Sequence, residues 1–262
     1  MPNNVRAPSK ALFITEPSRS MTEFGLLPLG LPLILAAPRG DGHPVMVFPG
    51  MAASDLSTIT LRTVLANKGY RVYGWDQGRN YGSEELMDPL LSRLSWIRQK
   101  HGATVSLVGW SLGGIYAREL AKLAPHDVRC VVTLGSPFKG PSKASNVWRI
   151  YEILSRNKVQ DDADPRFSVT PPVPTTAIFS RSDGIVAWQS CAEKPGPKVE
   201  SIEVVGSHVG LGHNALSLYA IADRLAQPEH SWAPFSPRGV RRWLYRNPWR
   251  DGESRNAVEG QV

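Results

Sequence analysis

A serine flanked by glycines, at the boundary between an apolar run and a helical pattern, constrains this chain more than any other feature. The segment 109–114 reads GWSLGG, follows the apolar run 105–108 and precedes a helical pattern. A G-x-S-x-G at a strand-to-helix turn is typical of a nucleophile elbow, which lifts a serine above the end of a parallel sheet. The strained turn crowds its neighbours, so positions 109 and 113 need residues without a Cβ. The pattern predicts that Ser111 is a nucleophile.

Apolar runs alternate with helical patterns along most of the chain, which predicts an α/β fold. Strands in this order, with helices between them, form a mostly parallel sheet with helices on both faces. The 262 residues suit a single domain, 1–262, with a core at about 44–226. In such sheets ligands bind at the carboxyl ends of the strands, where Ser111 is placed. The six predicted strands are 44–48, 71–76, 105–108, 128–134, 175–180 and 199–205.

Residues 139–173 interrupt this alternation without a predicted strand. An excursion of that length from the carboxyl end of a strand would overhang Ser111, so we expect a lid-like insertion. Trp148 and Tyr151 of this insertion, together with Trp110 beside the serine, are candidates for substrate binding. A surface insertion that packs only for its own stability is the alternative.

A serine hydroxyl becomes a good nucleophile when a base accepts its proton, and an imidazole needs an acid to orient it. Asp183 and His208 each follow a predicted strand, so they are expected at the same edge of the sheet as Ser111. Ser-Asp-Gly is also an ordinary turn sequence, and His213, beside the last predicted helix, is the alternative base. We favour Asp183 as the acid and His208 as the base.

The tetrahedral intermediate of acyl transfer carries an oxyanion, which two backbone N–H groups must meet. We expect one N–H from Leu112, the residue after the nucleophile. The other is expected from Met51, in the turn after the first strand, where Gly50 permits a close approach.

The segments 109–114, 182–183 and 207–211, in that order, resemble the α/β-hydrolases, and most of all the small bacterial triacylglycerol lipases and esterases. The resemblance spans about residues 44–226. It implies a serine hydrolase that cleaves carboxylic esters of a small molecule or a lipid through an acyl-serine intermediate. No metal or organic cofactor is implied. Many relatives carry His-Gly where this chain has Pro49-Gly50.

The resemblance implies the same roles for the residues already singled out. Ser111 would be the nucleophile, Asp183 the acid and His208 the base, with Met51 and Leu112 as oxyanion amides. The same residues could also support acyl transfer or the cleavage of thioesters or amides, because the acyl-enzyme is shared and only the acceptor differs. A membrane-associated binding protein that keeps the triad only as structure is a third hypothesis.

Two stretches favour contact with a lipid surface. Residues 24–37 are apolar but too short to cross a bilayer, and Pro28 and Pro32 should break a helix. We expect an irregular segment there that ends in an edge strand at 33–36. The tail at about 238–262 mixes arginine with tryptophan and tyrosine in a chain of net charge +7, which suits an anionic surface. A solvated tail is the alternative.

Several classes of partner and site are not expected. No nucleic-acid motif accompanies the basic tail, and Cys130 and Cys191 form neither a disulfide framework nor a metal-ligand spacing. The polar opening lacks the layout of a secretion signal, so we expect a cytosolic protein that is at most peripheral to a membrane. Nothing in the sequence indicates an oligomeric state.

Overall fold

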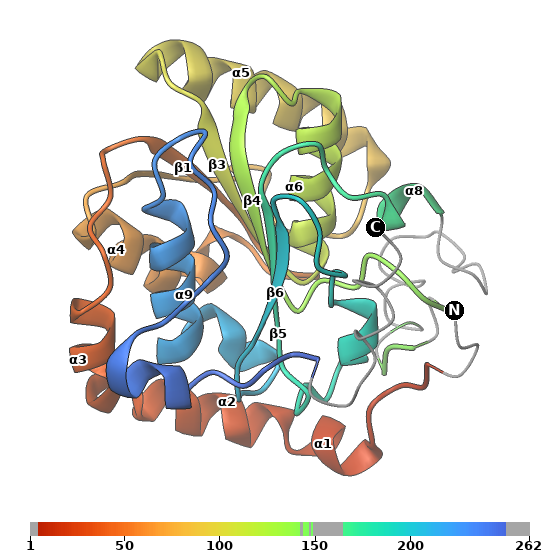
Figure 1. Ribbon diagram of the computed structural model, residues 1–262. Helices are drawn as coiled ribbons and strands as arrows, with labels where there is room; N and C mark the ends of the chain where they lie inside the picture. The colour runs from red at the N-terminus through yellow and green to blue at the C-terminus, as the bar shows by residue number, and fades with distance from the viewer. Residues whose placement is uncertain (1–4, 142–143, 147, 149–164, 250–262) are drawn as a thin grey trace, which may run out of the picture.

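The computed structural model describes residues 5–141, 144–146, 148 and 165–249 (Figure 1). Within these residues, six strands form one sheet in the order β2-β1-β3-β4-β5-β6, and every neighbouring pair is parallel. The sheet therefore has the predicted α/β architecture. Its strands are β1 (Pro44–Phe48), β2 (Arg71–Gly74), β3 (Val105–Trp110), β4 (Val128–Leu134), β5 (Thr175–Phe179) and β6 (Val199–Glu203).

Helices cover both faces of the sheet (Figure 1). Among the described residues, the α-helices are α1 (Lys10–Ile14), α2 (Glu16–Gly25), α3 (Leu27–Leu35), α4 (Ile59–Asn67), α5 (Met87–His101), α6 (Leu112–Leu123), α8 (Pro165–Ser168) and α9 (Ala215–Leu225). The 3₁₀ helices are η1 (Asp55–Thr58), η2 (Glu84–Leu86), η3 (Trp188–Ser190), η4 (Val209–Gly212) and η5 (Gly239–Trp243).

Alternating residues of β1 show how the two faces are buried. Val45 and Val47 belong to an apolar cluster shared with α3, α4 and α9. Met46 and Phe48 point to the opposite face, into a cluster shared with α5 and α6. A strand buried on both faces cannot alternate with polar residues, which explains why β1 is a continuous apolar run.

The apolar stretch 24–37 differs from the prediction. It contains the helix α3 rather than an irregular segment, and the edge strand expected at 33–36 does not form. Pro28 lies in the first turn of α3, where a backbone N–H has no acceptor within the helix, so its absence costs little. Pro32 lies inside α3 and removes one helical hydrogen bond. Packing of α3 against α9 compensates for that loss.

The segment expected to form a lid-like insertion, 139–173, lies largely outside the described residues. Its described part includes α8 and an isolated antiparallel bridge between Ser145 and Val186. The tail is described as far as Trp249, and the hydroxyl of Tyr245 donates a hydrogen bond to the Leu216 carbonyl at 2.9 Å. Across the described part of the chain, no helix has both the length and the apolar character needed to cross a bilayer.

Candidate functional site

Ser111 lies at the corner between β3 and α6. Its backbone has φ 52° and ψ −123°, a conformation that L-residues rarely adopt. A Cβ at Gly109 would collide with the backbone of α6, and a Cβ at Gly113 would come within 2.6 Å of the Pro49 carbonyl oxygen. The requirement for glycine at both positions, predicted from the sequence, is confirmed.

His208 and Asp183 extend from the ends of neighbouring strands to Ser111. The Nε2 atom of His208 is 2.9 Å from the Ser111 Oγ, and its Nδ1 atom is 2.6 Å from the Asp183 Oδ2. Because an ionised carboxylate only accepts, Nδ1 carries the proton and Nε2 accepts from the serine hydroxyl. The other Asp183 oxygen accepts from the N–H groups of Ile185 and Val186, at 2.8 and 2.7 Å. The Asp183 carboxylate is thereby fixed in position.

His213, the alternative base, has a different partner. Its Nε2 donates to the Ser20 carbonyl at 3.1 Å, and its ring makes an edge contact with Phe24. The structure therefore brings together Ser111, His208 and Asp183, and it places His213 against α2.

The surroundings of His208 favour its charged form. Burial alone would lower the pKa of this histidine, but the charge and hydrogen bond of Asp183, with the charge of Glu16, outweigh it. The net effect raises the pKa of His208 above its ordinary value. A positive imidazolium at His208 is therefore stabilised by its surroundings.

The imidazole of His208 is held from two further directions. Gly135, which follows β4, has φ +55°, and a Cβ there would lie 3.0 Å from the His208 Nδ1. The indole of Trp110 donates to the His208 carbonyl at 3.1 Å, so this side chain helps to hold His208 in place. Its predicted contact with substrate stays a prediction, as does that of the half-buried Trp148, and Tyr151 lies outside the described residues.

The turn after β1 lies directly beside the serine. A Cβ at Gly50 would meet the Ser111 Cβ at 3.4 Å, which places the following Met51 at the edge of the site. Leu112 is the first residue of α6, and the N–H groups of a first helical turn have no acceptor within the helix. The positions of both residues suit the predicted oxyanion amides.

The buried side chain of Asn80, which sequence reasoning missed, fixes this turn. Its amide donates to the Pro49 carbonyl at 2.9 Å, and its backbone carbonyl accepts from the Ala52 N–H at 2.7 Å. The only local signal was its place in a glycine-flanked loop after the second strand.

Glu16 is a second side chain that sequence reasoning missed. It joins the loop that carries Asp183 to the loop that carries His208. It is nearly fully buried at the start of α2. One of its oxygens accepts from the Gly184 N–H at 2.7 Å and the His208 N–H at 3.0 Å, and the other accepts from the Val209 N–H at 3.2 Å. A single carboxylate thus ties together the backbones beside Asp183 and His208.

Two neighbours on α2 extend this contact. Arg19 donates to the Ser182 carbonyl at 2.7 Å and to Glu16 at 2.8 Å, and Glu23 accepts from the Ser207 N–H at 2.6 Å. An acidic residue followed by Pro17 is a signal for a helix start, so α2 was detectable from sequence. Nothing local indicated that its acidic residues face the loops of residues 182–184 and 207–209.

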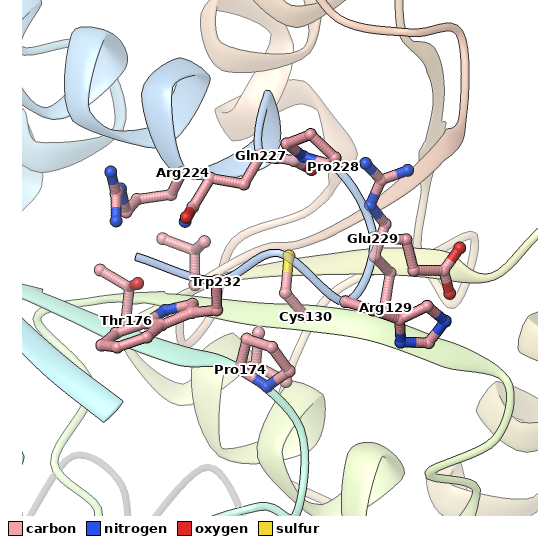
Figure 2. A pocket seen from close by; sticks show the side chains of 12 residues that line it. Arg129, Cys130, Pro174, Thr176, Arg224, Gln227, Pro228, Glu229 and Trp232 are labelled. Atoms are coloured by element: carbon pink, nitrogen blue, oxygen red, sulfur yellow. Dashed lines mark hydrogen bonds between the residues drawn. The ribbon is translucent and has the colours of Figure 1, made fainter. Parts of the chain in front are cut away.

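The pocket shown in Figure 2 is separate from this site. It lies at the amino ends of β4 and β5, where Arg129, Cys130, Pro174 and Trp232 are among its lining residues. Ser111 lies at the opposite, carboxyl end of β3. Burial raises the pKa of the Cys130 thiol, which disfavours the thiolate form.

A parallel sheet that presents a serine at a strand-to-helix corner, with histidine and aspartate from later strand ends, is the architecture of the α/β hydrolases. Residues 43–199 match the model of the alpha/beta hydrolase fold family, and the chain belongs to that family.

Curated relatives and solved structures are consistent with this assignment. A triacylglycerol lipase of Pseudarthrobacter phenanthrenivorans is 30% identical over 122 residues, 40% of this chain and 36% of that lipase. The match thus spans about a third of the relative's length. Aspergillus fumigatus lipase B has a TM-score of 0.56 at 18% identity, over 76% of this chain and 57% of that one. Carboxyl esterase 2 of Tuber melanosporum has a TM-score of 0.56 at 13% identity, over 70% and 76%. Such identities show a shared fold.

Proposed function

We propose that this protein hydrolyses carboxylic esters through an acyl-serine intermediate. The observation that carries the proposal is the chain of short contacts from Ser111 Oγ to His208 Nε2, at 2.9 Å, and from His208 Nδ1 to Asp183 Oδ2, at 2.6 Å. The ionised carboxylate selects the imidazole tautomer that can accept the serine proton. The raised pKa of His208 supports the same role.

The first half of the reaction forms the acyl-enzyme. The Ser111 Oγ attacks the ester carbonyl carbon while its proton moves to the His208 Nε2, and the carbonyl electrons become an oxyanion that the N–H groups of Met51 and Leu112 stabilise. The intermediate collapses when the C–O bond to the alcohol breaks. The departing alkoxide takes the proton from His208, so the alcohol leaves neutral.

The second half returns the enzyme to its starting state. A water molecule gives a proton to the neutral His208 and attacks the acyl carbon, and the proton then passes to the Ser111 oxygen as the carboxylic acid departs. Every proton taken up is returned within the cycle, so the reaction consumes only ester and water. Preorganised oxyanion donors contribute about 10²–10³-fold each in enzymes of this chemistry.

The substrate class proposed is an acyl ester of a small alcohol or a lipid. The curated relative is named a triacylglycerol lipase, which supports the ester but leaves acyl length open. A series of p-nitrophenyl esters from acetate to palmitate, followed by p-nitrophenol release, tests the reaction and gives the chain-length preference.

A fluorophosphonate probe tests the nucleophile. We expect covalent labelling at Ser111, and loss of both labelling and hydrolysis in Ser111→Ala. His208→Ala should lower kcat by about 10³-fold or more, whereas the matched variant His213→Ala should remain within a few fold of the wild type. An active His208→Ala with an inactive His213→Ala would overturn the assignment of the base. Transfer of the acyl group to an added alcohol in preference to water would indicate an acyltransferase.

A further inference from the structure

The helix α2 has the opposite orientation to an ordinary amphipathic surface helix. Such a helix turns its apolar side chains to the core and its polar ones to water. In α2 the buried residues are Glu16 and Ser20, whereas Met21 is 76% exposed and Phe24 is also exposed. The polar side of α2 therefore faces the protein, and its apolar side faces outward.

Exposed apolar side chains also occur on α1 and α3 and at the junction between α2 and α3. We call the whole group the outer apolar face, and it consists of Ile14, Met21, Phe24, Leu26, Leu29, Leu31 and Leu35, all exposed. Leu29, near its middle, is 77% exposed. Single exposed apolar residues need no explanation, but seven large ones within residues 14–35 indicate a surface that contacts something else.

Contacts on the inner side prevent α2 from rotating to bury this face. Four hydrogen bonds end on the Glu16 carboxylate, from Arg19 and from the N–H groups of Gly184, His208 and Val209. Turning α2 over would break these bonds and leave buried donors without acceptors, which is more costly than exposing methyl groups. The outer apolar face is thus a fixed feature of the fold.

Both acidic residues of the N-terminal helices accept hydrogen bonds from backbone N–H groups elsewhere in the protein. The acidic residues among the first 40 are Glu16 and Glu23, and both are engaged with the protein interior. Residues 230–249 contain no acidic residue and four arginines. Three of these, Arg238, Arg242 and Arg246, are exposed, and the Arg242 guanidinium lies over the ring of Trp243, which is 76% exposed.

The basic segment lies next to the helices. Leu33 of α3 and Tyr245 pack against the same buried cluster around Ala37 and Tyr219. In Figure 1 the blue C-terminal segment runs beside α3, in agreement with this shared packing. Apolar side chains bordered by arginine and tryptophan match the two zones of an anionic lipid surface, the acyl region and the phosphate layer.

We propose that the outer apolar face and the segment 238–244 dock this protein on an anionic lipid bilayer. The apolar side chains enter the boundary between headgroups and acyl chains, and the arginines bind lipid phosphates. Because α2 lies against η4, directly after His208, docking brings the carboxyl ends of the strands close to the membrane. The binding itself does not depend on the proposed esterase activity.

Vesicle flotation with the full chain carrying Ser111→Ala tests the proposal without lipid hydrolysis. We expect binding to phosphatidylcholine vesicles that contain phosphatidylglycerol, and weaker binding to pure phosphatidylcholine. Met21→Ser with Leu29→Ser should weaken binding by about tenfold or more, since each side chain loses apolar burial. The matched control, Leu123→Ser with Val169→Ser, removes two exposed apolar side chains elsewhere and should bind as before.

A second pair of variants tests the charge. Arg238→Gln with Arg242→Gln should abolish the preference for phosphatidylglycerol, whereas the exposed pair Lys194→Gln with Lys198→Gln should retain it. This arm holds even if the apolar variant fails to fold. If both double variants lose the preference for phosphatidylglycerol equally, the vesicles are attracted nonspecifically to a basic protein, and the proposal is overturned.

The competing occupant is a second copy of this chain. Sedimentation equilibrium distinguishes the two cases. A stable dimer that becomes a monomer with Met21→Ser and Leu29→Ser, together with no vesicle binding by the parent chain, would assign the face to self-association and overturn the lipid proposal.

Discussion

Replacing Glu16 by glutamine tests whether the N-terminal helix positions the proposed acid and base. Glutamine keeps the size of the side chain but replaces one carboxylate oxygen by an NH₂ group. That group would face the Val209 N–H, which now donates to a Glu16 oxygen at 3.2 Å. Two donors would then oppose each other next to His208, and the negative charge would be gone.

The structure sets the size of the effect. A hydrogen bond to a charged group contributes about 1.5–3 kcal/mol, and a buried donor left without an acceptor costs a similar amount. If this loss is fully expressed in the transition state, kcat/KM falls by roughly 10- to 100-fold. The same loss of folding free energy lowers Tm by roughly 3–5 °C for a chain of this size.

The pH dependence gives a second, independent measure. Hydrolysis requires neutral His208 in the free enzyme, so kcat/KM falls as the pH drops through the pKa of this residue. In the wild type that pKa is raised above 6.5, by Asp183 and, in part, by the carboxylate of Glu16. Removing this carboxylate lowers the pKa of His208. The acid limb of the kcat/KM profile should therefore move to lower pH in Glu16→Gln.

Glu23→Gln is the matched control. Glu23 lies on the same helix and also binds the loop that carries His208, because it accepts from the Ser207 N–H at 2.6 Å. The groups that raise the pKa of His208 are Asp183 and Glu16, and Glu23 is not one of them. We expect reduced stability in this variant with an unmoved acid limb. If Glu16→Gln lowers Tm but keeps kcat/KM and the acid limb of the wild type, Glu16 acts only in folding and our reasoning is wrong.

Three further substitutions probe the frame around the site. Asn80→Ala should lower the free energy of unfolding in urea by about 1–3 kcal/mol. It should also lower kcat, because the Pro49 carbonyl loses its side-chain donor. An unchanged kcat would show that Asn80 does not position the site. Gly113→Ala should lower kcat more than it raises KM, because its Cβ would displace the turn at Pro49; steady-state kinetics measure this, and unaltered kinetics would contradict it. Arg118→Met should destabilise the fold by about 3–5 kcal/mol, because the buried Glu193 carboxylate loses its ion-pair partner, now at 2.5 Å. Chemical unfolding measures this loss. If the double variant with Glu193→Met regains stability, the unpaired carboxylate is the cause.

The sheet and the serine corner were predictable because their signals are local. Each strand that is buried on both faces must be an apolar run, and a strained serine must have glycines two positions away on each side. The positions of Asp183 and His208 followed from topology, since the carboxyl ends of parallel strands meet at one edge. The choice of His208 over His213 depended on one criterion: His208 is the histidine that follows the last strand more closely.

The N-terminal helices could not be predicted in the same way, because the usual rule for a surface helix gives the wrong orientation for α2. Its buried positions are polar, and the reason lies about 170–190 residues away, in N–H groups of Gly184 and His208 that need an acceptor. Likewise Pro32 reads as a helix breaker until α9 is present to support α3. Because the inner side of α2 binds these loops, its remaining side chains are exposed. The exposed apolar surface and the positioning of His208 are therefore two consequences of one arrangement. A variant that loosens Glu16 should alter both hydrolysis and vesicle binding, whereas one that changes Leu29 should alter vesicle binding alone.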